Sequence, residues 1–354
     1  MARRTLKALV LTAAALLLTP LSGAATATAA EVTLRVHHFL PATSTTHADF
    51  LEPWAERVET QSDGRIAVEI FPAMQLGGRP PQLVDQVRDG VVDAAWTLPG
   101  YTPGRFPRTE VFELPFMPAS AEATSQALMA FHQRHLVDEY ADQNLHPILL
   151  HAHAPGVFHM RGEPVTDLAA LAGRKVRAPS RVIKKALDAL DAAPVGMPVP
   201  QVPQALSRGV IDGTLIPWEV ARPLKVHELV ESHTEVRDER GFYTATFAFV
   251  MNRETYDGLP ADLRAVIDAN SGLELAEEIG RVWDEADAAG MAAAKAEGNR
   301  VIRLTPSEVA RWRTRTAPVI EEWITAREAE GIDGAALVRD ARAMVERFDD
   351  AGDE

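Results

Sequence analysis

Arg177 is the side chain best placed for chemistry with a small anion. It lies in Lys175-Val176-Arg177-Ala178-Pro179, where the pattern predicts a strand that follows Gly173 and ends at Pro179. In open α/β sheets, ligands bind outside the carboxyl ends of the strands. An arginine there can hold a carboxylate through two parallel, charge-assisted hydrogen bonds. Judged by type and place alone, Arg177 is either such a clamp or an exposed arginine in a surface salt bridge.

Several histidines raise the question of a metal site. His151 and His153 are two residues apart, so in a strand they point to the same face. Together with His47 or His159 they could assemble a set of ligands. No cysteine or carboxylate lies at a matching spacing. We therefore interpret them as separate surface or cleft-edge histidines, and we expect neither a metal ion nor another cofactor.

Known catalytic motifs are missing from the sequence. It contains no G-x-S-x-G elbow, no H-E-x-x-H pair, no phosphate-binding loop and no cysteine. Serine and histidine occur, but their spacing singles out no catalytic triad. Because triads can be scattered along a chain, this argues only weakly against an enzyme. A binding protein is the reading that we prefer.

The elements that must position Arg177 follow an alternating order. Strand-like alternation at 32–36 and 66–70 flanks a helical pattern at 50–58, and a helix and a strand follow within 83–98. This β-α-β-α-β order predicts a parallel sheet covered by helices. A second series of the same kind runs from residue 147 to 216. The chain is therefore predicted to form two α/β lobes.

The C-terminal third is predicted to connect the two lobes. Phe242 to Met251 is a β-prone run that we expect to return the chain to the first lobe. Pro260 opens a helical stretch from Ala261 to about Glu297, which is longer than most globular helices and could span both lobes. Further helices are expected between Arg311 and Arg347.

The N-terminus carries the pattern of a secretory signal peptide. Basic residues at positions 3, 4 and 7 precede the apolar run Ala8–Leu18 and the small-residue tract Ala24–Ala30. The apolar run is too short to cross about 30 Å of hydrocarbon. We expect cleavage after residue 29 or 30 and export to a bacterial periplasm.

Composition limits the possible partners. The formal net charge is −14 and no basic patch stands out, so a nucleic acid is not an expected partner. With no cysteine, neither a disulfide nor an acylated lipoprotein anchor can form. No stretch after the signal peptide reaches 18 uninterrupted apolar residues, so we expect no direct membrane anchor.

Motifs spread over most of the mature chain resemble one protein family. They comprise Ser62–Ile66, Val68–Pro72, Gln75–Gly77, Gly90–Asp93, Glu113–Phe116, Asp167–Pro179, Gly209–Gly213 and Asn252–Leu263. In this order and spacing the chain resembles the extracytoplasmic solute receptors of tripartite ATP-independent periplasmic (TRAP) transporters, the DctP-like group.

This resemblance implies an α/β fold of the two-lobed periplasmic binding protein type, with a long helix spanning both lobes. The implied parts are a signal peptide (1–30), lobe I (31–153 plus about 242–282), lobe II (154–241 plus about 283–325), and a C-terminal helix and tail (about 326–354). The family's ligand is usually a carboxylate, which an arginine at the position of Arg177 binds as a salt bridge. The receptor then docks on the membrane subunits of a TRAP permease.

The sequence departs from the family's sialic-acid branch. Where that branch has a second arginine, this chain has Gly156-Val157-Phe158, with only Arg161 nearby. Apolar residues replace its polar ligand contacts. They include Phe39, Leu98, Tyr101, Val199 and Ile216. We therefore expect a monocarboxylate with an apolar or aromatic body, such as an aromatic acid or a short 2-oxo acid.

The predicted ligand-binding residues are Arg177, Phe39, Trp218, Tyr101, Trp96, Pro217, Phe158 and Arg161. For Phe39, Trp96 and Trp218, packing in the core or hinge is the alternative. Glu113 and Glu219 could accept a hydrogen bond from a ligand hydroxyl or orient Arg177, but a solvated surface carboxylate is the commoner role. The predicted function is a periplasmic transport receptor. A receptor for a membrane signalling protein and a secreted enzyme are the alternatives.

Overall fold

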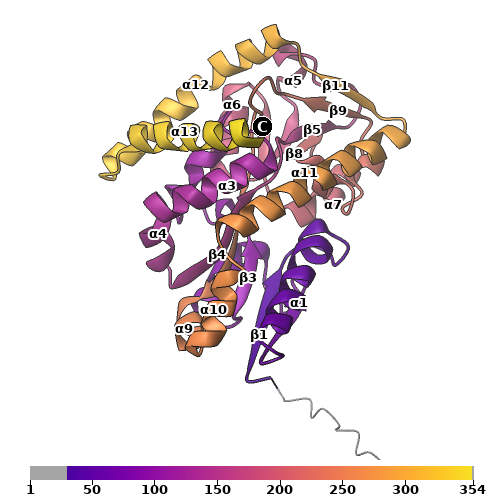
Figure 1. Ribbon diagram of the computed structural model, residues 1–354. Helices are drawn as coiled ribbons and strands as arrows, with labels where there is room; N and C mark the ends of the chain where they lie inside the picture. The colour runs from indigo at the N-terminus through magenta and orange to yellow at the C-terminus, as the bar shows by residue number, and fades with distance from the viewer. Residues whose placement is uncertain (1–29, 353–354) are drawn as a thin grey trace, which may run out of the picture.

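The computed structural model describes residues 30–352, so residues 1–29 of the predicted signal peptide lie outside the described residues. The described chain folds into two β-sheets, each flanked by helices (Figure 1). This is the predicted two-lobed α/β architecture. The predicted lobe boundaries themselves stay a prediction.

The first sheet has the strand order β2-β1-β3-β10-β4. Its strands are β1 (Val32–His38), β2 (Ile66–Phe71), β3 (Ala94–Thr97), β4 (Leu145–Ala152) and β10 (Thr246–Asn252). β1 pairs in parallel with β2 and β3, whereas β10 runs antiparallel between β3 and β4. The predicted return strand is thus present, but it begins at Thr246 rather than at Phe242. Residues 242–245 form the segment that crosses into this sheet.

The second sheet has the order β11-β9-β5-β8-β6-β7. Its strands are β5 (Val157–Met160), β6 (Lys175–Ala178), β7 (Ala193–Gly196), β8 (Gly213–Ile216), β9 (Ser232–Glu235) and β11 (Arg300–Arg303). β6 is parallel to both neighbours, β7 and β8, and β5 is antiparallel to β8 and β9. Arg177 therefore lies in an inner parallel strand, close to its carboxyl end.

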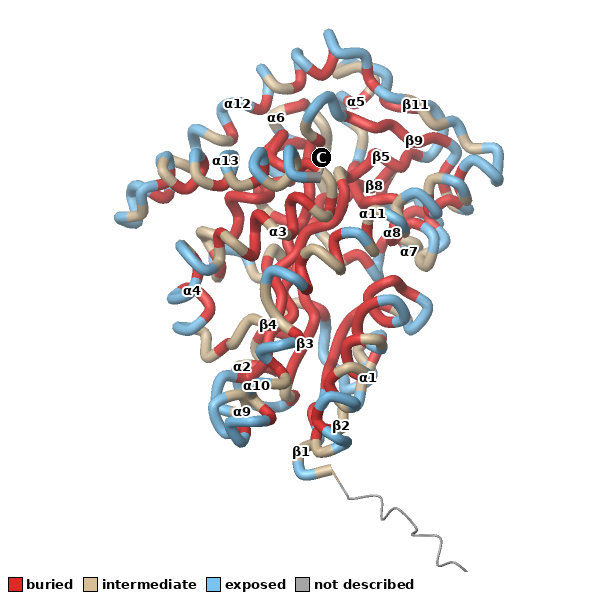
Figure 2. Tube along the Cα trace, in the orientation of Figure 1, coloured by how far each residue is buried: buried red, intermediate tan, exposed pale blue. Residues whose placement is uncertain are grey.

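Helices cover both sheets and present their exposed faces outward (Figure 2). They are α1 (Glu52–Gln61), α2 (Leu83–Arg88), α3 (Ala121–Phe131), α4 (Val137–Ala141), α5 (Leu168–Leu171), α6 (Arg181–Ala189), α7 (Val202–Ser207), α8 (Trp218–Ala221), α9 (Arg253–Gly258), α10 (Ala261–Ala269), α11 (Leu273–Ala296), α12 (Pro306–Ala329) and α13 (Gly334–Gly352). The strands between them are largely buried, as alternating apolar residues require.

The long helix α11 connects the two halves of the molecule. It packs against α3 and β4 of the first half and against α8 of the second, and it runs across both sheets in Figure 1. The single helix expected from Ala261 to Glu297 is interrupted. Gly272 has a φ of +87° and its N–H bonds to the carbonyl of Ile148. α10 ends at Ala269, and Gly272 is the residue directly before α11. Its positive φ, which glycine tolerates, lets α11 start in a new direction.

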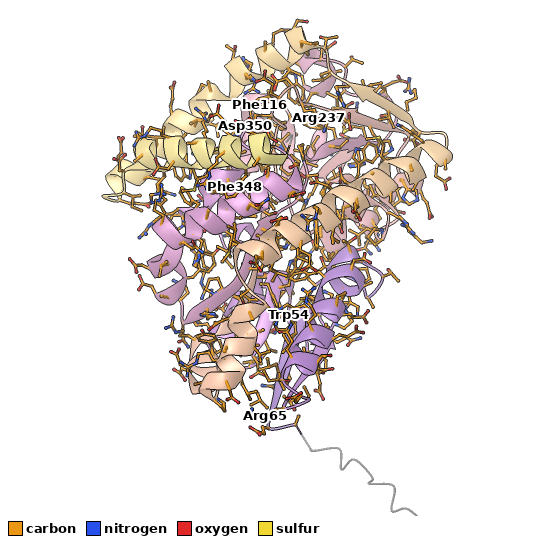
Figure 3. The ribbon with its side chains drawn as sticks, viewed as in Figure 1. Trp54, Arg65, Phe116, Arg237, Phe348 and Asp350 are labelled. Atoms are coloured by element: carbon orange, nitrogen blue, oxygen red, sulfur yellow. The ribbon has the colours of Figure 1, made fainter. Side chains whose placement is uncertain are left out.

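Each sheet has its own apolar packing. In the first, Trp54 projects from α1 (Figure 3), meets Phe249 edge-on with ring centroids 4.8 Å apart and donates to the carbonyl of Asn270. In the second, Phe158, Phe242 and Trp312 form a separate cluster. Within residues 30–352, no helix is both long enough and apolar enough to cross a membrane.

Candidate functional site

A cavity lies between the two sheets, where several strands end. Its empty volume is about 380 Å³, counting the space that is open to solvent. Phe39, Leu98, Pro179 and Pro217 line it directly after β1, β3, β6 and β8, respectively. The cavity therefore occupies the position at the carboxyl ends of parallel strands that α/β proteins use for ligands.

Arg177 supplies the cavity with a buried cation. Its side chain is held by three acceptors: Nε donates to the carbonyl of Met197 (2.9 Å), Nη1 to that of Leu215 (3.0 Å) and Nη2 to the Tyr101 hydroxyl (3.3 Å). The residue is only 2 % exposed. No carboxylate of the described residues lies within 4.0 Å of it, so its neighbours are neutral dipoles. Two of its five N–H groups have no acceptor among these contacts.

Tyr101 connects the two halves of the site. It lies in the 3₁₀ turn η3 (Pro99–Tyr101), which follows β3. Its hydroxyl oxygen accepts from Arg177 and from the backbone N–H of Val199 (2.8 Å). With both lone pairs engaged, the hydroxyl proton is free to be donated into the cavity. Burial raises the pKa of Tyr101, partly offset by Arg177, so the proton is retained.

Aromatic rings form the wall of the cavity on the side of the first sheet. Trp96 stacks on Phe247 with ring centroids 4.6 Å apart and an interplanar angle of 17°. The ring centroid of Phe39 lies 5.0 Å from that of Trp96 and 5.5 Å from that of Tyr101. Such a wall offers broad apolar faces and few polar atoms, which suits a planar ligand body.

The histidines beside this wall are neutral. Trp96 Nε1 donates to Nε2 of His151 (2.8 Å), and the N–H of Ala245 donates to Nε2 of His153 (3.0 Å). Burial lowers the pKa of His151 to about 3 and that of His153 to about 4. Arg177 is therefore the cationic group of the cavity at neutral pH.

The other histidines considered as metal ligands are engaged elsewhere. His47 bonds to His38, and His159 bonds to His233 with 2.7 Å between their Nδ1 atoms. Across residues 30–352, no group of three or more histidine, aspartate or glutamate side chains is arranged to hold a metal ion.

The structure brings five of the eight predicted ligand-binding residues to this cavity. They are Phe39, Trp96, Tyr101, Arg177 and Pro217. Trp218 is buried against His159 and His233 behind the cavity wall. Phe158 packs in the core of the second sheet, and Arg161 is exposed beyond the end of β5. Whether the five cavity residues contact a ligand stays a prediction.

Glu113 and Glu219 are both buried, so the expectation of solvated surface carboxylates is wrong for both. Glu113 is fully buried; its Oε1 accepts from the N–H and hydroxyl of Thr246 and lies outside the cavity lining. Glu219 is 4 % exposed and lines the cavity.

Sequence reasoning missed several residues of the wall. Tyr243 and His153 line the cavity because the chain crosses between the sheets just before β10 and just after β4, and Phe247 lines it from the start of β10. The β-prone pattern of Phe242–Met251 is the sequence signal for the part of the wall that this segment forms. The strands that neighbour β10 in the sheet, β3 and β4, come from far earlier in the chain, so this pattern does not identify them.

Comparison with known proteins places the chain in a family. The model of "Bacterial extracellular solute-binding protein, family 7", the DctP family, matches residues 36–326. The chain belongs to this family. The resemblance to TRAP solute receptors drawn from the sequence motifs is thereby confirmed.

Among solved structures of DctP-family proteins, a TRAP solute-binding protein from an unidentified marine microbe is 46% identical. Its TM-score is 0.88, with 90% of this chain and 99% of that one covered. It is described as specific for aromatic acids and was solved with metahydroxyphenylacetate and with 3-hydroxybenzoate. A protein from Rhodoferax ferrireducens, solved with copurified benzoate, is 44% identical, with a TM-score of 0.87 and coverage of 90% and 99%.

A relative of known cellular location is more distant. The C4-dicarboxylate-binding periplasmic protein DctP of Rhodobacter capsulatus is 27% identical over 81% of this chain and 84% of its own.

Proposed function

We propose that this DctP-family protein is a periplasmic receptor that binds an aromatic monocarboxylate and delivers it to a TRAP permease. The observation that carries the proposal is Arg177, a buried cation without a carboxylate partner among the described residues, beside an aromatic wall. Burying a charge is costly unless it is paired. A ligand carboxylate would supply the missing partner.

In this proposal the carboxylate bonds to the two N–H groups of Arg177 that have no acceptor and to the hydroxyl of Tyr101. Both donors meet at one place, because Tyr101 itself accepts from Arg177. The ring of the ligand then lies along Phe39, Trp96 and Phe247, which line the same cavity.

The ligands of the relatives support the aromatic class. Two solved relatives above 40% identity hold benzoate, 3-hydroxybenzoate or metahydroxyphenylacetate. The apolar wall also disfavours a sugar acid, whose hydroxyl groups would lose hydrogen bonds to water at a cost of about 1–3 kcal/mol each.

The family supports the proposed location and delivery. The relative from Rhodobacter capsulatus is periplasmic, and the predicted signal peptide supports export of this chain. Delivery to a permease is tested with proteoliposomes that carry the TRAP membrane subunits. Uptake of labelled benzoate should require this receptor; binding to a sensor protein without uptake would favour signalling.

The direct test is calorimetry with benzoate, benzamide and glucuronate. Benzamide keeps the ring and the shape but removes the negative charge. We expect benzoate to bind at least about 30-fold more tightly than benzamide, because only benzoate pairs with Arg177. Recovery of unaltered benzoate would separate a receptor from an enzyme. A screen in which only polyhydroxylated sugar acids stabilise the protein would overturn the proposal.

A further inference from the structure

Glu219 is a second buried polar group of the cavity, and the carboxylate clamp does not use it. It belongs to α8, which follows β8, and is 4 % exposed. It lines the same cavity as Arg177, yet the two side chains are not within 4.0 Å of each other. The cavity therefore carries a cation at one place and an acid at another.

One oxygen of this acid is without a partner. Oε1 of Glu219 is buried and makes no hydrogen bond to any described residue. Buried polar atoms are almost always hydrogen-bonded, because losing water without a replacement costs free energy. A partner supplied by a ligand in the cavity would remove that cost.

The surroundings keep Glu219 uncharged. Its pKa is raised to about 8: burial is the main cause, Asp287 and Asp49 add to the rise, and Thr45 opposes it. Asp287 and Glu285 face it from α11 and Asp49 from the turn before α1; Arg222 and Lys225 line the outer pocket beside it. None of these cations lies within 4.0 Å of it. At neutral pH it is a carboxylic acid that can both donate and accept.

The main chain at Glu219 is firmly held. Its N–H donates to Oδ1 of Asp287 (2.9 Å). Gly290 of α11 lies so close that a Cβ there would be 2.1 Å from the carbonyl oxygen of Trp218. The long helix thus fixes the position from which Glu219 reaches the cavity.

We propose that Glu219 determines specificity: as an uncharged acid it hydrogen-bonds a hydroxyl group on the ring of the ligand, while Arg177 holds the carboxylate. This deepens the proposed function and rests on it. A second carboxylate on the ligand is disfavoured here, because Asp49 and Asp287 are near. A ligand ammonium would instead require Glu219 to be ionised.

The test compares benzoate with 2-, 3- and 4-hydroxybenzoate at pH 7 for the wild type, Glu219→Gln and Glu219→Leu. The amide of glutamine has the shape of the neutral acid and keeps a donor and an acceptor. We expect wild type to bind at least one hydroxy isomer about tenfold more tightly than benzoate, and Glu219→Gln to keep this preference. Glu219→Leu should lose it, measured as the ratio of the hydroxybenzoate affinity to the benzoate affinity of the same variant.

A pH series adds an independent readout. Between pH 7 and 9 the wild-type affinity for the hydroxy acid should fall as Glu219 ionises. The affinity of Glu219→Gln should fall less, because only Asp287, whose pKa burial raises to about 7, then titrates beside the ligand.

Three results would overturn the inference. They are a hydroxyl preference that survives in Glu219→Leu, no hydroxyl preference in wild type, and tighter binding of 3-(aminomethyl)benzoate than of the hydroxybenzoates by wild type. In each of these, tight binding of benzoate leaves the proposed function standing. If wild type binds none of these aromatic acids, the proposed function fails and this inference fails with it.

Discussion

Replacing Arg177 with methionine tests the clamp with little change of side-chain volume. The variant removes the cation and its two free N–H groups but keeps an unbranched side chain at the floor of the cavity. It also removes three hydrogen bonds to Met197, Leu215 and Tyr101. The donor of each bond is the charged guanidinium group, so each contributes about 1.5–3 kcal/mol to stability. Their loss is offset by no longer burying an unpaired cation.

The expected magnitudes therefore differ for stability and for affinity. Unfolding free energy should change by no more than about 2 kcal/mol, because the two contributions oppose each other. Affinity for benzoate should fall by about 2–5 kcal/mol, or roughly 30- to 5,000-fold, since the carboxylate is left buried and unpaired. Arg177→Lys keeps the charge but not the planar fork, so its loss should be intermediate.

Calorimetry with benzoate and urea unfolding measure the two quantities on the same samples. Arg161→Met is the matched control, because Arg161 is exposed and lies outside the cavity lining. It should bind benzoate as the wild type does. If Arg177→Met is folded and binds benzoate within threefold of wild type, the carboxylate does not pair with Arg177 and the reasoning is refuted.

Three further predictions concern the surroundings of the site. Arg181 on α6 forms a two-pronged ion pair with Glu110 (2.6 and 2.8 Å), so Arg181→Gln should weaken benzoate binding about two- to fivefold in calorimetry by loosening closure; an unchanged affinity would contradict this. Gly290→Ala should lower stability to urea by about 1–3 kcal/mol, because its Cβ would overlap the Trp218 carbonyl; a stability equal to wild type would mean that α11 adjusts freely. Glu219 has a pKa raised to about 8, so its contribution is fully present below its unfolded value of 4.5 and is lost as pH rises through 8. The difference in unfolding free energy between Glu219→Gln and wild type should therefore shift in favour of the variant by more than about 1 kcal/mol from pH 5 to pH 8, measured by thermal melts. A difference that does not depend on pH would show that the acid is ionised in the folded protein.

Local patterns were enough to predict most of the elements near the cavity. The alternation of Val32, Leu34 and Val36 predicted β1, and the run ending at Pro179 predicted β6. The position of Arg177 followed from a general rule, that parallel strands present their carboxyl ends to a ligand. That rule needs only the strand and its direction, both of which the sequence contains.

The wall of the cavity depended on contacts between distant segments. Phe247 faces Trp96 because β10 inserts between β3 and β4, an order that no local pattern specifies. Trp218 and Glu219 are adjacent in a short helix, and only the packing of α11 decides which of them turns toward the cavity. The sequence pattern predicted Trp218 as the ligand-binding residue, whereas in the structure Trp218 is buried outside the cavity lining and Glu219 lines the cavity.

The distribution of the cavity residues over the two sheets links ligand binding to lobe closure. Phe39, Trp96 and Tyr101 come from the side of the first sheet, and Arg177 comes from the second. Tyr101, which follows β3 of the first sheet, bonds across to Arg177 and to the N–H of Val199 on the side of the second sheet. A ligand gains the cation and the aromatic wall together in the closed form, and only one of them in an open form. Because an equilibrium shifts by the difference in affinity between its states, an aromatic acid favours closure more strongly than either fragment of it does, benzene or acetate, taken alone.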